Sequence, residues 1–201
     1  PITLSPKANG DVRICADYSK TLNPVLIAAH QPIPKAEELF DKMHGSAYYC
    51  IIDINQAYLH VELDEESSKI ATMSTHLGTY KVNRMWYGLK TGPSLFHSVM
   101  QPILTNLKGV VNFFNDLAVF GKTLEECKIN LIAPLERLQK FKICLNRDKC
   151  KFFVQELRCL GHIISKQGLQ KDPKKVEAIK CAPVPKNEAE LRRFLGNSWG
   201  W

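Results

Sequence analysis

Two positions in the chain could act together as a metal site. Asp53 ends the apolar run Tyr48–Ile52, which predicts a buried strand, and the pair Asn115-Asp116 interrupts the apolar segment Val110–Phe120. β-Branched and aromatic residues on both sides of a two-residue polar break predict a β-hairpin with its turn at this pair. Carboxylates at adjacent strand ends can jointly hold a divalent ion. The alternative is a turn that only reverses the chain, because Asn and Asp tolerate left-handed backbone conformations.

Basic residues near the N-terminus form a second candidate group. Lys7 and Arg13 flank the turn-forming sequence Asn9-Gly10-Asp11, and the runs 2–4 and 12–15 around it are strand-like. A hairpin there would place Lys7 and Arg13 on neighbouring strands, where two cations could hold a phosphate. The alternative is an ordinary exposed hairpin whose charges are solvated.

His97 and a group of cysteines with His162 could take part in chemistry or could be purely structural. His97 lies within the helical apolar pattern of residues 94–107, and a lone His that faces a core is more often structural than catalytic. Cys150, Cys159 and His162 could be combined into a zinc site, although the chain has no Cys-x-x-Cys pair.

The composition predicts a globular protein with a basic surface. The chain has 201 residues, of which 45% are hydrophobic and 23% charged, so it can bury a sizeable core and is not expected to be disordered. The 27 Lys and Arg residues exceed the 20 Asp and Glu residues, which gives a formal charge of +7. A basic surface suits nucleic acid, although a merely solvated basic surface has the same composition.

The cysteines and the lack of long apolar runs indicate a reduced, intracellular protein. Seven cysteines form an odd number without a repeating spacing, which is typical of thiols rather than of a disulfide framework. No apolar run approaches the roughly 18 residues of a membrane span, and no signal-peptide core occurs near the N-terminus. Because the first residue is Pro1 rather than Met, we expect a fragment or a processed piece.

The elements that must position these residues follow an α+β order. Helices are expected over residues 35–43, 94–107, 123–141, 172–180 and 187–195, with one helical turn at 64–68. Strands are expected over residues 2–4, 12–15, 48–53, 70–75, 80–86, 110–114, 117–120, 143–145, 150–154 and 157–165. The helix from Thr123 has a capping box, Thr123-Leu124-Glu125-Glu126, and Pro102 is expected to bend or end its helix.

Six motifs, taken in order, resemble the reverse transcriptase of Ty3/gypsy-type LTR retroelements. They are Val12–Tyr18, Asp53–Tyr58, Tyr87-Gly88-Leu89 with Pro93 and Phe96, the hairpin 110–121, Leu160-Gly161-His162, and Lys175–Ile179 with Leu191–Gly196. The resemblance implies an α+β right-hand polymerase fold. It assigns residues 1–165 to part of the fingers and the palm, and residues 166–201 to the start of a truncated thumb, without an RNase H domain.

The resemblance also implies a reaction. Members of the family synthesise DNA from deoxynucleoside triphosphates on an RNA or DNA template with a DNA primer, and they use two Mg²⁺ ions held by three carboxylates. Asp53 and Asp116 match two of these carboxylates, and Ile54 lies at the same metal site. The family's Y-x-D-D turn reads Phe113-Phe114-Asn115-Asp116 here, so Asn115 replaces a metal-binding carboxylate. An amide lacks the charge, and we expect a rate loss on the order of 10³-fold.

The resemblance assigns further positions to the nucleotide and the primer. The implied nucleotide-binding residues are Lys7, Arg13, Gln56, Ala57, Tyr58 and His97. Tyr58 matches the aromatic residue that excludes a 2′-hydroxyl, His97 stands where the family usually has Gln, and Leu160 with Gly161 matches the primer-binding turn. Two alternatives to an active polymerase remain. One is a co-opted module that binds nucleic acid without turnover, including as a subunit beside a second chain, and the other is a decayed remnant.

Overall fold

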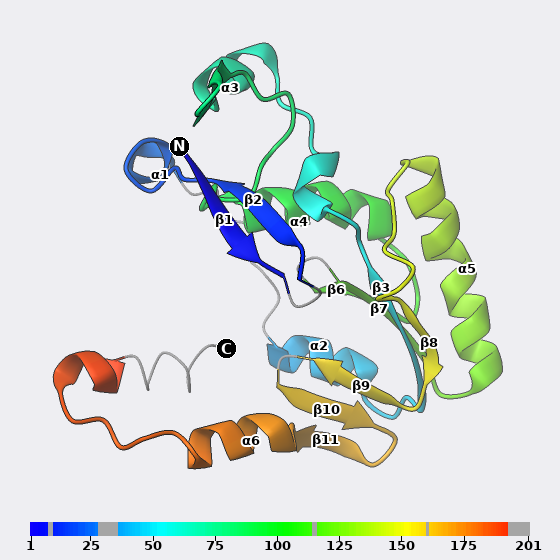
Figure 1. Ribbon diagram of the computed structural model, residues 1–201. Coiled ribbons are helices and arrows are strands. Elements are labelled where there is room, and N and C mark those ends of the chain that lie inside the picture. The colour runs from blue at the N-terminus through cyan, green and yellow to red at the C-terminus, as the bar shows by residue number, and fades with distance from the viewer. Residues whose placement is uncertain (8–9, 28–35, 114–115, 160, 193–201) are drawn as a thin grey trace.

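The computed structural model describes residues 1–7, 10–27, 36–113, 116–159 and 161–192 (Figure 1). Its strands are β1 (Ile2–Pro6), β2 (Val12–Ala16), β3 (Tyr48–Asp53), β4 (Met73–Thr75), β5 (Gly78–Tyr80), β6 (Val110–Phe113), β7 (Asp116–Gly121), β8 (Lys151–Val154), β9 (Glu156–Cys159), β10 (His162–Ser165) and β11 (Gly168–Lys171). Its helices are α1 (Leu22–Val25), α2 (Ala36–Met43), the 3-10 turn η1 (Ala57–His60), α3 (Glu65–Ile70), α4 (Gly92–Leu104), α5 (Leu124–Lys140) and α6 (Pro173–Lys180). This mixture is the α+β class that the sequence predicts.

A four-stranded antiparallel sheet with the order β6-β7-β3-β8 forms the centre of the fold. β3 is apolar along almost its whole length, and its side chains alternate between the two faces, with Cys50 and Ile52 in one core cluster and Tyr49 in another. β3 and β7 pair in an unbroken register that ends at Asp53↔Asp116. The two aspartates therefore lie side by side at one end of the two central strands.

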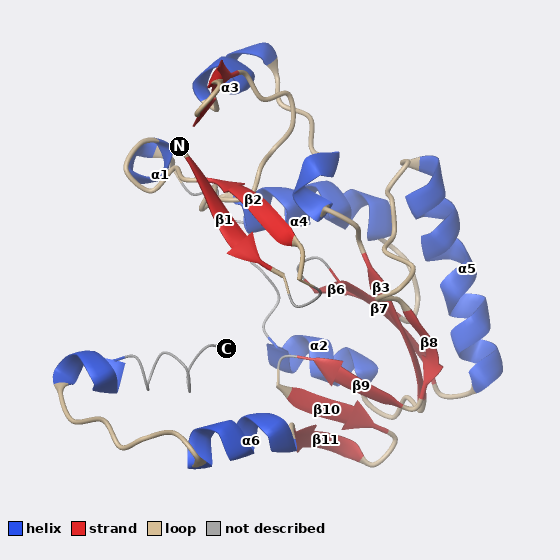
Figure 2. Ribbon diagram, viewed as in Figure 1, coloured by secondary structure: helices blue, strands red, loops and turns tan. Residues whose placement is uncertain are grey.

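Different elements cover the two faces of this sheet. Figure 1 shows α4 and α5 on one side of the central strands and α2 with β9–β11 on the other, and Figure 2 shows the same division by element type. The first cluster includes Cys50, Ile52, Phe96, Met100, Leu117, Val119, Leu131 and Leu138, and the second includes Leu39, Met43, Tyr49, Ala118, Leu157 and Ile164. Each fully buried Val, Leu, Ile, Phe or Met side chain in these clusters contributes about 1.5–3 kcal/mol. The two clusters hold the aspartate-bearing strands between packed layers.

The N-terminal hairpin is confirmed, with one correction. β1 pairs antiparallel with β2 in a register that includes Leu4↔Ile14, as the turn sequence predicts. Arg13 lies on β2, but Lys7 follows the end of β1 and is not on a strand. The hairpin is anchored at its base, where Ala16 N donates a hydrogen bond to Tyr87 O at 2.9 Å.

The predicted start of α5 is also confirmed. Thr123 Oγ1 accepts a hydrogen bond from Glu126 N at 3.1 Å, and Glu126 Oε2 accepts one from Lys122 N at 2.7 Å. The first contact satisfies a backbone donor that the first helical turn leaves without a helical partner, and the second holds the residue before the cap. The helix begins at Leu124 and extends along the sheet to Lys140.

The central hairpin reverses one residue earlier than predicted. Phe113 pairs with Asp116, so Asp116 is the first residue of β7 and not part of the turn. The connecting residues 114 and 115 lie outside the described part of the chain. Leu117 and Val119 must face the cluster under α4 and α5, and a slip of one residue would turn them to the opposite face.

The strand predicted over residues 80–86 is wrong for most of its length. β5 ends at Tyr80, and beyond it Arg84 forms one isolated bridge with Glu62. Val82 and Met85 are buried in two different core clusters. These two residues are three positions apart, so they do not follow the two-residue period of a strand face, and each packs into a different core.

Other boundaries differ in smaller ways. Ile70 belongs to α3, which Asp64 caps by accepting a hydrogen bond from Ser67 N at 2.7 Å, and α4 continues past Pro102 to Leu104. Residues 168–171 form β11, a strand that the sequence does not predict because it is largely polar.

The predicted boundary after residue 165 falls between β10 and β11, which pair with each other. The assignment of palm and thumb around it stays a prediction. No helix in the described ranges is long and apolar enough to cross a membrane.

We expect Tyr49 to make the fold sensitive to strong alkali. Its side chain is fully buried, and its hydroxyl donates to Ser46 O at 2.8 Å. Burial raises the pKa of Tyr49 to about 12, whereas an unfolded tyrosine ionises at a pH of about 10. The folded state therefore keeps this proton more tightly, and its contribution to the free energy of unfolding is complete below a pH of about 10 and is lost as the pH rises toward about 12. Urea unfolding measured from pH 8 upward should show a smaller alkaline loss in Tyr49→Phe than in the wild type. An equal loss in both proteins would contradict this assignment.

Candidate active site

Asp53 and Asp116 form the acidic pair that the sequence predicts. Residues paired directly across an antiparallel ladder have Cβ atoms about 4.5–5.5 Å apart, and Asp53↔Asp116 is such a pair. Asp116 is exposed at the surface, yet partial desolvation of its carboxyl group raises its pKa, the neighbouring Asp53 carboxylate raises it further, and Lys149 opposes both. The repulsion between Asp116 and Asp53 shows that two negative charges lie close together, which is the electrostatic setting that attracts a cation.

Lys149 is a member of this site that sequence reasoning missed. Its ammonium nitrogen lies 3.7 Å from Asp53 Oδ2. Lys149 directly follows the predicted polar break Asn146-Arg147-Asp148. It lies 96 residues after Asp53 in the sequence, and no local pattern connects the two positions. The pairing of β3 with β8, the strand that follows Lys149, brings them together.

Backbone hydrogen bonds fix the segment that follows Asp53. Asn146 N donates to Asp53 O at 2.9 Å, Asn55 N donates to Cys144 O at 2.9 Å, and Ile54 forms an isolated bridge with Leu145. These bonds extend the pairing of β3 beyond its last residue. The Asp53 main chain is therefore held between β7 on one side and residues 144–146 on the other.

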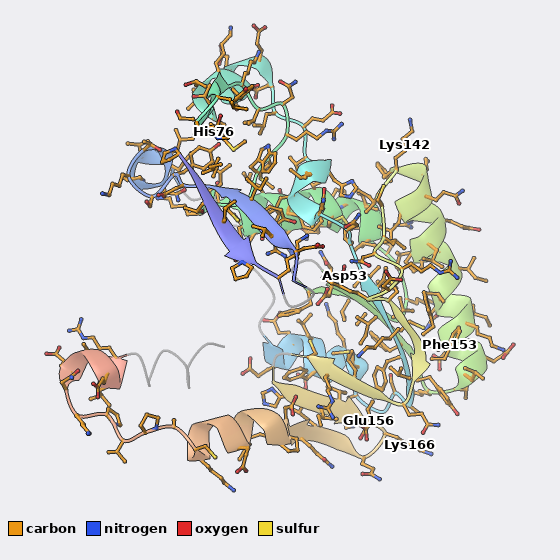
Figure 3. All side chains as sticks on the ribbon, viewed as in Figure 1. Asp53, His76, Lys142, Phe153, Glu156 and Lys166 are labelled. Atoms are coloured by element: carbon orange, nitrogen blue, oxygen red, sulfur yellow. The ribbon has the colours of Figure 1, made fainter. Side chains whose placement is uncertain are left out.

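A cleft of about 930 Å³ joins the acidic site to the N-terminal hairpin. Its lining residues are Ser5, Pro6, Lys7, Asp11, Val12, Arg13, Ile14, Asp53, Ile54, Asn55, Gln56, Ala57, Leu59, Trp86, Tyr87, Asn146, Asp148 and Lys149. In Figure 3, Asp53 lies between the β1–β2 hairpin and the layer formed by α2 with β9–β11. The structure thus places both predicted triphosphate cations, the first carboxylate and the Gln56-Ala57 backbone around one cleft.

The two cations have defined local partners. The Arg13 guanidinium carbon lies 4.8 Å from the centre of the Tyr87 ring, a cation–π arrangement that directs the side chain. Lys7 Nζ lies 3.8 Å from Asp11 Oδ2, and Lys7 N donates to Asp11 O at 2.7 Å. Burial raises the pKa of the Tyr87 hydroxyl, and the charge of Arg13 partly opposes this.

The residues after Asn55 adopt a special local conformation. Gln56 has φ 48° and ψ 50°, in the left-handed region, and precedes η1. Ala57 is buried, and the Tyr58 ring packs against the rings of Tyr87 and Phe96, with centroid separations of 5.0 and 6.0 Å. Tyr58 therefore packs behind the lining of the cleft, against Tyr87, the residue whose ring contacts Arg13.

His97 lies away from the cleft. It is buried in α4, where its Nδ1 is 3.5 Å from Asn112 Nδ2. Burial lowers the pKa of His97, which favours the neutral imidazole. This position fits the structural interpretation of His97, and its assignment to nucleotide binding stays a prediction.

Two predicted positions cannot be placed, and one alternative loses support. Asn115 and Leu160 lie outside the described residues. Gly161 is described, with φ 71°, and its carbonyl accepts a hydrogen bond from Asp172 N at 2.8 Å. Within the described ranges, no three His, Cys, Asp or Glu side chains form a group that could hold a metal, and this includes the alternative zinc ligands Cys150, Cys159 and His162.

The donor set of the acidic pair fits a hard divalent ion. Asp53 and Asp116 supply carboxylate oxygens at adjacent strand ends, and hard ions such as Mg²⁺ prefer oxygen ligands. The described residues supply two carboxylates rather than the three implied by the family, because position 115 carries an amide. The site therefore has the right ligand type but a reduced negative charge.

Comparisons with known proteins identify the family of the chain. A family model described as reverse transcriptase (RNA-dependent DNA polymerase) matches residues 5–164. The retrovirus-related Pol polyprotein from transposon 297 of Drosophila melanogaster is 34% identical over 199 residues, which cover 97% of this chain and 19% of that protein. The transposon Tf2-3 polyprotein of Schizosaccharomyces pombe is 27% identical over 199 residues, which cover 98% of this chain and 15% of that protein. The chain thus spans less than a fifth of the length of these relatives.

Solved structures show the same fold. The foamy viral protease-reverse transcriptase in complex with double-stranded DNA superposes with a TM-score of 0.87 at 20% identity, over 100% of this chain and 42% of that one. The same enzyme in complex with an RNA/DNA hybrid gives a TM-score of 0.82 at 19% identity, over 98% of this chain and 26% of that one. This likeness confirms the right-hand polymerase fold. The family match over most of the sequence, together with the polyprotein relatives, shows that the chain belongs to the reverse transcriptase (RNA-dependent DNA polymerase) family, as a domain of an LTR-retroelement polyprotein.

Proposed function

We propose that this domain binds a template-primer duplex and a deoxynucleoside triphosphate at the cleft, and that its own nucleotidyl transfer is strongly impaired. The observation that carries the proposal is the arrangement of opposite charges: Asp53, paired with Asp116, and the cations Lys7 and Arg13 border one cleft. A reaction that joins a hydroxyl to a triphosphate needs both kinds of group.

Asp53 and Asp116, with Ile54 beside them, would hold the Mg²⁺ ions expected for the family. Mg²⁺ bound there would supply Lewis acidity for the primer 3′-hydroxyl and neutralise charge on the triphosphate. The chain's own residues provide the positioning. Backbone pairing on both sides fixes Asp53, and contact with the Tyr87 ring holds Arg13 at the lining of the cleft, where it would bind a triphosphate.

Asn115 is the reason to expect weak chemistry. It directly precedes Asp116 and replaces one of the carboxylates that the family uses. Two carboxylates then have to balance two divalent ions, and the site loses charge stabilisation that matters most in the transition state. Binding of the duplex depends on phosphate contacts spread over a basic surface, so it should survive this loss.

Primer extension on poly(rA)/oligo(dT) tests the polymerase assignment. We expect slow but measurable incorporation by the wild type, and loss of this residual activity in Asp53→Asn. Asp148→Asn is the matched control, because Asp148 lines the same cleft but is not paired with Asp116. Residual incorporation that persists in Asp53→Asn would show that it does not arise at this site.

A non-catalytic nucleic-acid-binding module is the second candidate, and Asn115 is the observation that favours it. Such a module, alone or beside a second chain, would bind an RNA/DNA hybrid with an affinity that falls steeply with salt and would incorporate nothing. Fluorescence anisotropy at several salt concentrations separates the candidates when read beside primer extension. Binding without incorporation selects the module, and binding with incorporation abolished by Asp53→Asn selects the polymerase.

A further inference from the structure

The turn that carries Lys149 is attached to the main chain of Asp53. Asn146 N donates to Asp53 O at 2.9 Å, and the same residue accepts from Lys149 N at 3.2 Å and from Cys150 N at 3.1 Å. The turn is therefore a backbone extension of the acidic strand. Lys149 reaches the Asp53 carboxylate because of this attachment, which distinguishes the contact from a chance meeting of two flexible surface side chains.

Lys149 offsets part of the negative charge of the acidic pair. In the described part of the chain, it is the cation that forms an ion pair with Asp53, whose side chain is only 21% exposed. Lys7 borders the same cleft but is paired with Asp11, and among the ion pairs of the described residues none joins Arg13 to Asp53. The Lys149 side chain is 63% exposed, so it can move into solvent without leaving a packed position.

We propose that Lys149 is a built-in counter-ion of the Asp53–Asp116 pair, which offsets part of the negative charge of the pair in the metal-free protein and competes with a divalent ion for it. The inference rests on the proposed function, because it takes the pair as the metal site. The Lys149 ammonium group and a divalent ion are both attracted to the Asp53 carboxylate, and the two cations repel each other. With Asn115 in place of a third carboxylate, a single lysine offsets a larger share of the negative charge of the site.

Metal binding tests the proposal without any measurement of activity. Titration of the wild type and of Lys149→Met with Mn²⁺, followed by electron paramagnetic resonance of the free ion, should show binding that is about tenfold tighter in the variant. Lys149→Arg keeps the charge and should bind like the wild type. Lys166→Met is a matched control: it removes one charge from an exposed lysine in the turn between β10 and β11, which Figure 3 shows well away from Asp53.

Thermal unfolding provides a second test, in which the metal-free variant should be less stable although it binds metal more tightly. In EDTA, Lys149→Met should unfold at a lower temperature than the wild type, because the two carboxylates lose their counter-ion. Addition of Mg²⁺ should stabilise the variant more than it stabilises the wild type. A lysine with a merely structural role would lower the unfolding temperature without tightening metal binding.

Two outcomes separate failure of this inference from failure of the proposed function. The same titrations are made with Lys149→Met in the Asn115→Asp background. If Asn115→Asp binds Mn²⁺ and removal of Lys149 changes the affinity in neither background, Lys149 is not a competitor and the metal site stands. If Asn115→Asp does not bind Mn²⁺ and Asp53→Asn changes nothing, the acidic pair is not a metal site, and both proposals are overturned.

Discussion

Replacement of Asn115 by Asp should raise the rate of primer extension by about 10³-fold, which corresponds to about 4 kcal/mol of transition-state stabilisation. The substitution restores a carboxylate directly before Asp116, which pairs with Asp53. A third negative ligand increases both the affinity for divalent ions and the charge balance as the triphosphate reacts. Single-turnover incorporation on poly(rA)/oligo(dT) with saturating Mg²⁺ isolates the chemical step from metal binding.

Asn146→Asp is the matched control for this gain. It converts an amide to a carboxylate in the same cleft, but at a position that belongs to the turn before Lys149 and not to the central hairpin. We expect no comparable gain from it. Equal gains from both substitutions would mean that general negative charge in the cleft, rather than a ligand at position 115, limits the rate. No gain from Asn115→Asp would favour the binding module or a remnant.

Gly88→Ala should destabilise the protein by about 3 kcal/mol. Gly88 has φ +114°, and a Cβ there would overlap the carbonyl oxygen of Ala16. The unfavourable backbone conformation costs about 1–2 kcal/mol and the overlap about 1–3 kcal/mol. Its neighbours leave little freedom to adjust, because Asn23 Nδ2 donates to Gly88 O at 2.9 Å and Ala16 N donates to Tyr87 O at 2.9 Å. The thermal midpoint should fall by about 6–12 °C.

Gly78→Ala separates the two parts of this cost. Gly78 has φ +127°, but a Cβ there would meet nothing within 4 Å. Its substitution therefore reports the backbone conformation alone and should cost about 1–2 kcal/mol. If Gly88→Ala is no more damaging than Gly78→Ala, the close approach of β2 to residue 88 is not maintained in solution.

Elements with strong local signals were predictable. The buried run at Tyr48–Asp53 gives β3 with the predicted bounds, and the capping box at Thr123 gives the start of α5. Both signals lie within a few residues of the feature that they determine. The proximity of Asp53 and Asp116 was also predictable, because both aspartates lie at strand ends and the two strands pair with each other. Their role as metal ligands stays a prediction.

Features set by distant contacts were not predictable. The turn of the central hairpin was misplaced because Asn115 and Asp116 are both turn-forming residues, and the register across β3 decides between them. Lys149 had no local signal at all, since it reaches Asp53 through the pairing of β8 with β3. His97 looked the same from sequence whether it faced the cleft or the core, and packing against β6 decided in favour of the core.

The pairing that aligns Asp53 with Asp116 has a consequence for how such a domain changes over generations. The alignment depends on backbone hydrogen bonds of β3, β6 and β7 and on apolar residues such as Ile52 and Leu117, and these contacts within the described strands do not depend on metal binding. A copy of the element can therefore lose a metal ligand by one substitution without a loss of folding stability, so selection for folding does not remove that copy. Silencing and decay are separate events in such a lineage, and a silent copy can persist as a folded, basic protein on which selection for a binding role can act.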